Sequence, residues 1–230
     1  MKLFTISIVC LAATVAPLAA QNTLTQAEKK SGWKLLFDGK SLDGWRNYKG
    51  KGVRSGWKVV DGTMTHSKGG GDIITDAQYG NYELRLQWKI AEGANSGIFV
   101  GVREVNGAIY FSGVEMQILD NEKHPDAKHE KHVSGSCYGL IKPPAGAAKK
   151  AGEWNDVRIV SQDGHYQFFL NGVKTADFKI DSVEFVDRIA NSKFKQWPHF
   201  ARYRKGHIGF QDHGDQVSFK NIRIKELPKK

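Results

Sequence analysis

The sequence has few of the features that stabilise a chain by means other than a folded core. Only two of its 230 residues are cysteines, Cys10 and Cys137. Cys10 lies within residues 1–20, which have the pattern of a cleaved secretory signal: Lys2, an apolar run at residues 3–15 and a small-residue end. Without this segment Cys137 stands alone, so an intramolecular disulfide is excluded. We therefore expect a hydrophobic core to hold the fold, and about 210 residues can bury one.

The sequence also lacks an apolar run that could cross a membrane. Such a span takes about 20 residues, and the apolar part of residues 1–20 is shorter. No lipidation pattern precedes Cys10. We therefore expect an exported protein, periplasmic or extracellular, without a membrane anchor, and residues 21–31 are expected to be a flexible polar leader.

No nucleic-acid motif is found, although positive charge is in excess. Lys and Arg number 34 against 24 Asp and Glu, a formal net charge of +10, or +9 once Lys2 is removed. The basic residues are scattered, apart from short groups such as Lys149-Lys150. The charge therefore favours solubility and long-range steering, and we expect no nucleic-acid partner.

Amphipathic helical patterns of ten residues are absent, as are internal repeats and linkers. Short strand patterns follow one another instead. Residues 82–90 alternate polar and apolar side chains, and Asp61-Gly62 and Asn171-Gly172 each join two strand patterns as hairpin turns. Further strands are expected at 98–103, 112–120, 154–160, 206–211 and 217–224, with a turn at 94–97. The pattern predicts one all-β domain at residues 32–227, an antiparallel β-sandwich or jelly roll.

The strand at 112–120 carries the first candidate site. Alternation sends its apolar side chains to one face and Glu115 and Gln117 to the other. A polar face of this kind can form the floor of a cleft, or it can simply face water. Asp120 ends the strand, and it could join Glu115 as an acid–base pair only if the strand bends or bulges, because strict alternation separates the two.

The segment 211–214, Gln-Asp-His-Gly, is the second candidate site. It follows a glycine-rich strand, and the glycine allows a sharp turn. An imidazole near a carboxylate can shuttle a proton. The alternative is that Asp212 and His213 only organise the turn.

A histidine-bearing loop and two aromatic residues are further candidate sites. The loop contains His124, His129 and His132 with Asp126 and Glu130, but this spacing matches no zinc pattern, so a solvated loop is expected. Most aromatic residues fall on the apolar side of strands and belong to the core. The expected exposed exceptions are Trp197 and Tyr203.

Taken in chain order, the motifs resemble the 3-keto-disaccharide hydrolase domain family. They extend from about residue 33 to 227, and they are Leu36–Trp45, Asn95–Phe99, Gly113–Asp120, His124–Ala127, Gly152–Asn155, Leu170–Gly172, Ser192–Lys195, Gly206–Ile208 and Gln211–Gly214. Each motif is weak alone, and the ordered set is specific. The resemblance implies a concanavalin A-like jelly roll, in agreement with the strand pattern.

The resemblance also implies a reaction: cleavage of 3-keto-glycosides or 3-keto-disaccharides, sugars oxidised to a ketone at carbon 3. Such a ketone acidifies the proton at carbon 2, so a base can form an enolate that expels the group at carbon 1, after which water adds. A sugar 3-dehydrogenase is the expected functional partner, because it would supply the ketone. Whether a divalent cation takes part stays open.

Roles for individual residues follow from the matching positions. Glu115 and His213 are the acid and base candidates, with Asp120 as a further catalytic candidate. The expected substrate-binding residues are Gln117, Asn95, Gln211 and Asp212 for sugar hydroxyls and Lys195 for the enolate oxygen. Two other functions remain open: an ordinary glycosidase that uses Glu115 and Asp120, and a non-catalytic carbohydrate-binding module, since jelly rolls serve that role as well.

Overall fold

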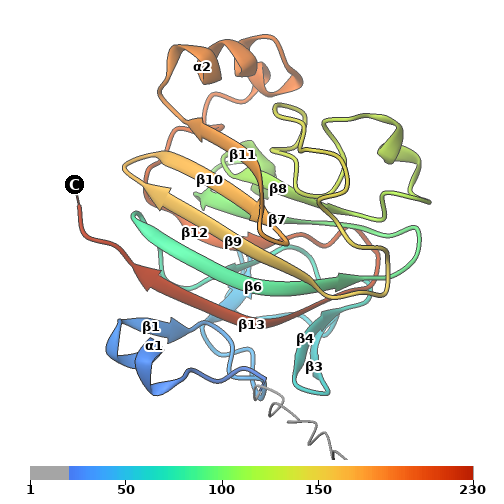
Figure 1. The fold of residues 1–230 in the computed structure, drawn as a ribbon, viewed down its shortest axis with the longest axis vertical. Helices are drawn as coiled ribbons and strands as arrows, with labels where there is room; N and C mark the ends of the chain where they lie inside the picture. The colour runs from blue at the N-terminus through green and yellow to red at the C-terminus, as the bar shows by residue number, and fades with distance from the viewer. Residues whose placement is uncertain (1–20, 230) are drawn as a thin grey trace, which may run out of the picture.

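The structure is a computed structural model that describes residues 21–229, so the secretory signal expected at 1–20 lies outside the described residues. Two antiparallel sheets pack against each other (Figure 1). The larger sheet contains, in spatial order, β11 (Val173–Lys179), β10 (His165–Leu170), β9 (Asn155–Gln162), β6 (Tyr82–Ile90), β13 (Val217–Glu226), β4 (Thr63–His66) and β3 (Trp57–Val60), and β1 (Trp33–Leu35) also pairs with β13. The predicted all-β sandwich is confirmed.

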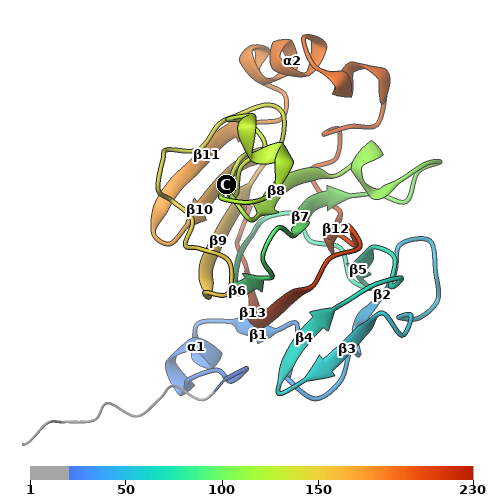
Figure 2. The same ribbon diagram turned by 90° about the vertical axis from the view of Figure 1, so that its right-hand side faces the viewer.

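The smaller sheet carries the candidate site residues. Its order is β2 (Trp45–Asn47), β5 (Ile73–Thr75), β12 (His207–Phe210), β7 (Asn95–Val102) and β8 (Val114–Leu119). Figure 2 shows this sheet beside the larger one, with β8 at its edge. The free side of β8 is covered by residues 134–138. The Gln117 N–H donates to the Ser136 carbonyl at 3.1 Å, the Gly135 N–H donates to the Gln117 carbonyl at 2.9 Å, and Cys137 forms a β-bridge with Met116.

The local sequence explains the strands. In β6 the burial alternates along nearly all nine residues, as a half-buried strand requires. Both predicted hairpins are present, and their central residues have positive φ: 47° and 71° at Asp61 and Gly62, 50° and 82° at Asn171 and Gly172. Two-residue turns of this kind match the twist of the flanking strands.

The hydrophobic core lies between the two sheets. Phe210 of β12 stacks on Phe219 of β13 with ring centroids 4.0 Å apart, so this pair joins the sheets directly. Trp88, Met116 and Ile98 are also fully buried in the same cluster. Burial of each such side chain contributes roughly 1.5–3 kcal/mol to the free energy of unfolding. The core therefore stabilises the fold without a disulfide, and Cys137 is a free, buried thiol.

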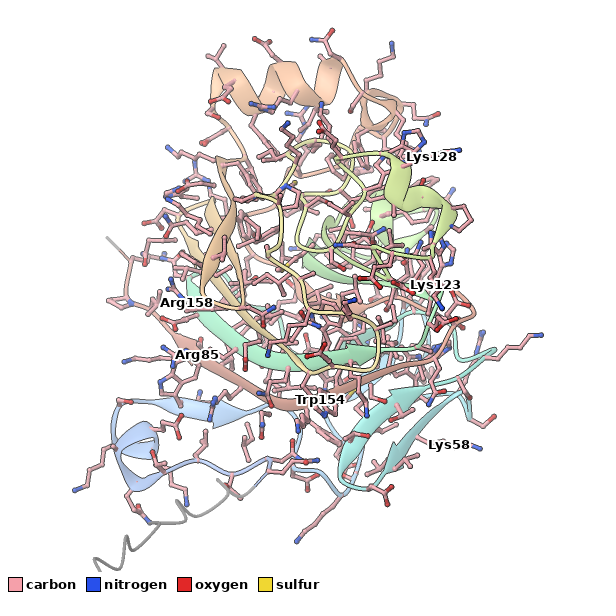
Figure 3. All side chains as sticks on the ribbon, turned by 45° about the vertical axis from the view of Figure 1, so that its right-hand side comes forward. Lys58, Arg85, Lys123, Lys128, Trp154 and Arg158 are labelled. Atoms are coloured by element: carbon pink, nitrogen blue, oxygen red, sulfur yellow. The ribbon has the colours of Figure 1, made fainter. Side chains whose placement is uncertain are left out.

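Helices are short and lie outside the sheets. In the described part of the chain they are α1 (Gln26–Lys30), α2 (Val183–Ala190) and three 3₁₀ turns, η1 (Ile109–Phe111), η2 (Pro125–Lys128) and η3 (Lys193–Gln196). Within residues 21–229, no helix combines the length and hydropathy that a membrane crossing needs. Positive charge is spread over the surface, as the labelled side chains on β3, β6, β9 and the loop after β8 show (Figure 3).

Two expectations need correction. The polar leader at 21–31 is ordered: Thr25 and Glu28 form a capping box for α1, and Asn22 exchanges two hydrogen bonds with Asn221 of β13. The turn expected at 94–97 is instead the start of β7, which begins at Asn95. The sequence did not predict this part of the strand because Ser96 and Gly97 are small residues without a strand-forming preference. In the structure both residues pair with β8.

Candidate functional site

A polar cleft of about 510 Å³ opens on the face of the smaller sheet that is turned away from the core. Met116 and Ile118 of β8 point into the core, so alternation turns Glu115 and Gln117 outward to the floor of the cleft. The lining residues are Asp72, Asn95, Tyr110, Glu115, Gln117, Tyr138, Lys193, Phe194, Trp197, Gln211, Asp212 and His213. The cleft therefore unites residues from both predicted sites, although they lie far apart in sequence.

Gly97 makes the space that the Glu115 side chain fills. Gly97 lies opposite Gln117 in the β7–β8 ladder, next to the Phe99–Glu115 pair. A Cβ atom at Gly97 would lie 2.2 Å from Glu115 Oε1 and 2.9 Å from its Cγ and Cδ atoms. The absence of a side chain at this position is thus what allows the carboxyl group to lie over the sheet.

The Glu115 carboxyl group is strongly perturbed. The residue is only 8 % exposed. Burial raises the pKa of Glu115 to about 8; the Lys193 charge opposes this rise, while the charges of Asp72 and Asp126 add to it. A carboxyl group with a pKa near neutrality can both take up and release a proton at working pH, which is what acid–base catalysis requires.

Asp72 is a second carboxyl group in the cleft that the sequence did not identify. Burial raises its pKa to about 6, the backbone N–H of Asp212 lowers it, and the Asp212 charge raises it further. That N–H donates to Asp72 Oδ1 at 2.9 Å. Asp72 follows Gly69-Gly70-Gly71, so the available signal was an acidic residue placed at the end of a glycine-rich loop.

Asp212 organises the wall of the cleft. Its carboxylate accepts the backbone N–H groups of Gly71 at 2.6 Å and Gly214 at 2.8 Å, and it lies 2.9 Å from Nε2 of the buried His66. Burial raises the pKa of Asp212, but these backbone hydrogen bonds and His66 lower it overall. The carboxylate is therefore an ionised anchor that ties the 69–71 loop to the segment after β12.

Two amide side chains offer free acceptors to the cleft. Asn95 Oδ1 and Gln211 Oε1 are buried and have no hydrogen-bond partner among the described residues. Buried polar atoms are rarely left in this state, because each costs about 1–3 kcal/mol. Gln117 also lines the cleft, and its Oε1 accepts the Ile118 backbone N–H at 3.2 Å. Unsatisfied acceptors on a cleft floor are suited to sugar hydroxyl donors.

The rim of the cleft combines histidine, lysine and aromatic side chains. His213 is exposed and lines the same cleft as Glu115. Trp197 was expected to be exposed but is half-buried, and it packs against Tyr110 with ring centroids 5.1 Å apart. Tyr203, the other predicted aromatic residue, contacts His199 at 2.7 Å and does not line the cleft.

The lysine in the cleft is Lys193, and Lys195 lies elsewhere. Lys193 Nζ lies 4.4 Å from the centroid of the Tyr138 ring, while Lys195 lines a small hollow near Pro198 on the far side of η3. The reason is geometric, since residues two apart in a 3₁₀ turn point in widely different directions. Both lysines belong to the motif Ser192–Lys195. The sequence therefore identified the motif, but it did not show which of its two lysines lines the cleft.

Asp120 is likewise outside the set of residues that line the cleft. Its carboxylate accepts the backbone N–H of Gly93 at 2.7 Å and that of Glu122 at 3.0 Å. Burial raises the pKa of Asp120, but these hydrogen bonds lower it overall. The observed contacts give Asp120 a role in fixing the loops at the end of β8, and its catalytic role stays a prediction that its position does not support.

One group of side chains has the composition of a metal site. The ligand atoms of Asp126, His129 and His132 lie within 4.8 Å of one another. These residues belong to the loop expected to be solvated, yet Asp126 and His132 are half-buried. Tyr138, which lines the cleft, donates its hydroxyl to Asp126 Oδ2 at 3.3 Å.

A β-sandwich with a buried, proton-exchanging carboxyl group, free amide acceptors and a rim of aromatic residues defines a carbohydrate-active enzyme. Comparison with known proteins gives the particular family. Residues 32–225 match the model of the 3-keto-alpha-glucoside-1,2-lyase-like domain, so the chain belongs to that family.

Related proteins agree with this assignment. The chain is 34 % identical to a 3-keto-disaccharide hydrolase of Bacteroides thetaiotaomicron, over 91 % of this chain and 83 % of that protein. A crystal structure of a putative glycosyl hydrolase from Parabacteroides distasonis is 32 % identical, with a TM-score of 0.86 over 91 % of this chain and 100 % of the other. A galectin-like protein of unknown function from Bacillus subtilis shares the fold, with a TM-score of 0.52 at 10 % identity over 92 % of this chain and 97 % of the other.

Proposed function

We propose that this protein cleaves 3-keto-glycosides, including 3-keto-disaccharides, by removing the proton at carbon 2, eliminating the group at carbon 1 and adding water to the product. The observation that carries the proposal is Glu115, a buried carboxyl group with a pKa of about 8 in a polar cleft. A carboxylate of this kind is a stronger base than an ordinary one, and a proton next to a ketone needs such a base.

The chemical steps can be assigned to residues of the cleft. Ionised Glu115 takes the proton from carbon 2, and the electron pair of the C–H bond forms the enolate of the carbon-3 ketone. Lys193 supplies positive charge for the enolate oxygen. As the enolate collapses, the bond from carbon 1 to its oxygen breaks, and His213 donates a proton to the departing oxygen. Water then adds its oxygen to carbon 1 and gives a proton to His213, while the Glu115 carboxyl group, after exchanging its proton with solvent, protonates carbon 2, so both residues return to their starting states.

The remaining lining residues support substrate binding. Asn95 and Gln211 offer their free acceptor atoms to sugar hydroxyl groups, and Gln117 completes the floor. Trp197 and Tyr110 provide an aromatic surface at the rim, on which a sugar ring can stack. The ketone must come from oxidation of a sugar hydroxyl, so a sugar 3-dehydrogenase is the expected supplier. The secretory pattern of residues 1–20 supports a reaction outside the cytoplasm.

A substrate deuterated at carbon 2 tests the mechanism. Elimination followed by hydration in ordinary water should replace the deuterium with hydrogen in the released 3-keto-sugar, after the spontaneous exchange has been subtracted. Retention of the label after complete turnover would overturn the elimination route and favour direct displacement at carbon 1. The unoxidised parent glycoside is the matched control: an ordinary glycosidase would cleave it, and a carbohydrate-binding module would cleave neither compound.

A further inference from the structure

Two consecutive backbone turns bring Asp126, His129 and His132 close together. The His129 N–H donates to the Asp126 carbonyl at 3.1 Å, and the His132 N–H donates to the His129 carbonyl at 2.8 Å. The two turns meet at His129, whose backbone is extended (φ −102°, ψ 113°) just after η2. They bring one carboxylate and two imidazoles of the segment Asp-x-x-His-x-x-His together, with ligand atoms within 4.8 Å of one another.

The other acidic and histidine residues of the loop are engaged elsewhere. His124 Nδ1 accepts the Asp126 backbone N–H at 3.1 Å and so caps η2. Glu130 pairs with Lys142 at 3.1 Å, in an exposed position. His124 and Glu130 are thus held by other partners, whereas the ligand atoms of Asp126, His129 and His132 lie within 4.8 Å of one another.

The loop that holds these ligands is fixed at its C-terminal end. Ser134 exchanges hydrogen bonds with both backbone groups of Leu119, at 2.7 and 2.8 Å. The Tyr138 N–H donates to the Glu115 carbonyl at 3.0 Å. The segment after His132 therefore runs along β8, which limits the conformations that the ligands can adopt.

One ligand atom lacks a satisfactory partner. His132 Nδ1 is buried and makes no hydrogen bond of acceptable geometry to any described residue, although it lies 3.0 Å from Asp126 Oδ1. The His129 and His132 rings lie 5.0 Å apart, centroid to centroid. The carboxylate oxygen and the ring nitrogens of the two histidines therefore lie close enough to bind a common ion.

We propose that Asp126, His129 and His132 bind one divalent transition-metal ion, with water completing its coordination. Two imidazoles and one carboxylate suit zinc and its chemical neighbours, whereas magnesium and calcium prefer oxygen ligands alone. Tyr138 connects the ion to the cleft, because its hydroxyl contacts Asp126 and its ring lies in the cleft wall under Lys193. The role of the ion is structural: it holds this wall of the cleft in place.

Metal binding can be measured without substrate, so the outcome does not depend on the proposed function. The purified protein, freed of any affinity tag and of metal by chelator, is titrated with Co²⁺ by visible absorption and with Zn²⁺ by calorimetry. We expect one ion per chain, with a Kd on the order of 1 μM. A hundredfold excess of Zn²⁺ over this Kd should also raise the Tm by about 5 °C or more.

Two variants locate the site. His129→Ala removes an exposed side chain, and Asp126→Asn keeps the shape of its residue, so both should fold as the parent does. Each should weaken Co²⁺ binding by more than about tenfold and abolish the Zn²⁺-dependent rise in Tm. His199→Ala, which removes an exposed histidine far along the chain, should change neither measurement. Parent protein that does not saturate by about 1 mM Co²⁺, or undiminished binding by both folded variants, would overturn the proposal.

Discussion

The outward face of the smaller sheet has two halves of opposite character. One half is a small apolar cluster of Ile74, Phe99, Val102 and Ile109, all fully buried. The other is the polar cleft above Asn95, Gly97, Glu115 and Gln117. The boundary is sharp, since Phe99 of β7 lies directly opposite Glu115 of β8 in the strand register.

The difference lies in how well each half satisfies its own groups. The apolar half consists of packed hydrophobic side chains and contains no charged group. The polar half keeps a buried carboxyl group with a raised pKa and two amide oxygens without a described partner. Groups held in this condition oppose folding. Local conflicts of this kind are expected where a protein binds or transforms a ligand, so the comparison predicts opposite effects of substitution in the two halves.

The largest effect is expected from Glu115→Gln. The substitution keeps the shape of the cleft floor and removes the titrating group, so kcat/KM on a 3-keto-glucoside should fall by about 10²–10⁴-fold. The measurement is the initial rate of sugar release. Glu122→Gln, at an exposed carboxylate, is the matched control and should keep the parent rate. A Glu115→Gln rate within tenfold of the parent would contradict the role assigned to this residue.

The same substitution should change how stability depends on pH. The pKa of Glu115 is raised from 4.5 to about 8 in the folded protein. The folded state therefore binds more protons between these values, and the free energy of unfolding falls as pH rises through this window and levels off above it. Between pH 5 and pH 8, the free energy of unfolding measured with urea should fall by up to about 4 kcal/mol more in the parent than in Glu115→Gln. Parallel pH profiles would show that Glu115 does not titrate as inferred.

Gly97→Ala should disturb the polar half through shape alone. The new Cβ atom would lie 2.2 Å from Glu115 Oε1, so the carboxyl group must move by about an ångström. Misplacement on this scale costs about 10²-fold in rate. The readout is kcat/KM together with far-UV circular dichroism, which should be unchanged. Gly52→Ala is the matched control, because Gly52 has open space around it. Gly172→Ala would not serve, because the positive φ of Gly172 strains any other residue.

The two lysines of η3 provide a smaller and sharper contrast. Lys193→Ala removes the positive charge from the cleft and should lower kcat by about tenfold, a modest value because the side chain is exposed and screened by solvent. Lys195→Ala removes the same charge outside the cleft and should leave kcat within about twofold of the parent. Equal losses in both variants would mean that long-range charge, rather than placement, explains the effect.

The sequence predicted the fold and one half of the site for clear physical reasons. Alternation along β6 and β8 and the two Asn/Asp-Gly turns follow from local rules, and so does the outward direction of Glu115 and Gln117. Asp72 and Lys193 were missed because their positions depend on a loop and on the register of a 3₁₀ turn. The family resemblance pointed to Lys195, two residues from Lys193 in the same motif. Spacing alone does not show which residue of so short a turn faces the cleft.

The strand start and the histidine loop show the same limit. Gly97 has the sequence signal of a turn residue, because the space it leaves for Glu115 exists only after β7 and β8 have paired. The spacing of His124, His129 and His132 matches no zinc pattern, whereas the folded loop places Asp126 beside His129 and His132. Contacts that depend on tertiary pairing or on turn geometry carry no periodic signal in the sequence.

The smallest effect is expected in the apolar half, from Ile74→Val. Ile74 is fully buried in the cluster with Phe99 and Ile109, and it is not among the residues that line the cleft. Loss of one methyl group should lower the free energy of unfolding by about 1 kcal/mol, which corresponds to about 2–4 °C in Tm. The value of kcat/KM should stay within about twofold of the parent, because the cleft keeps its shape and its charges. Urea unfolding and initial rates on the same preparation check both parts. A large loss of rate at unchanged stability would mean that the two halves of this face are coupled, and the contrast between a stabilising half and a reactive half would then fail.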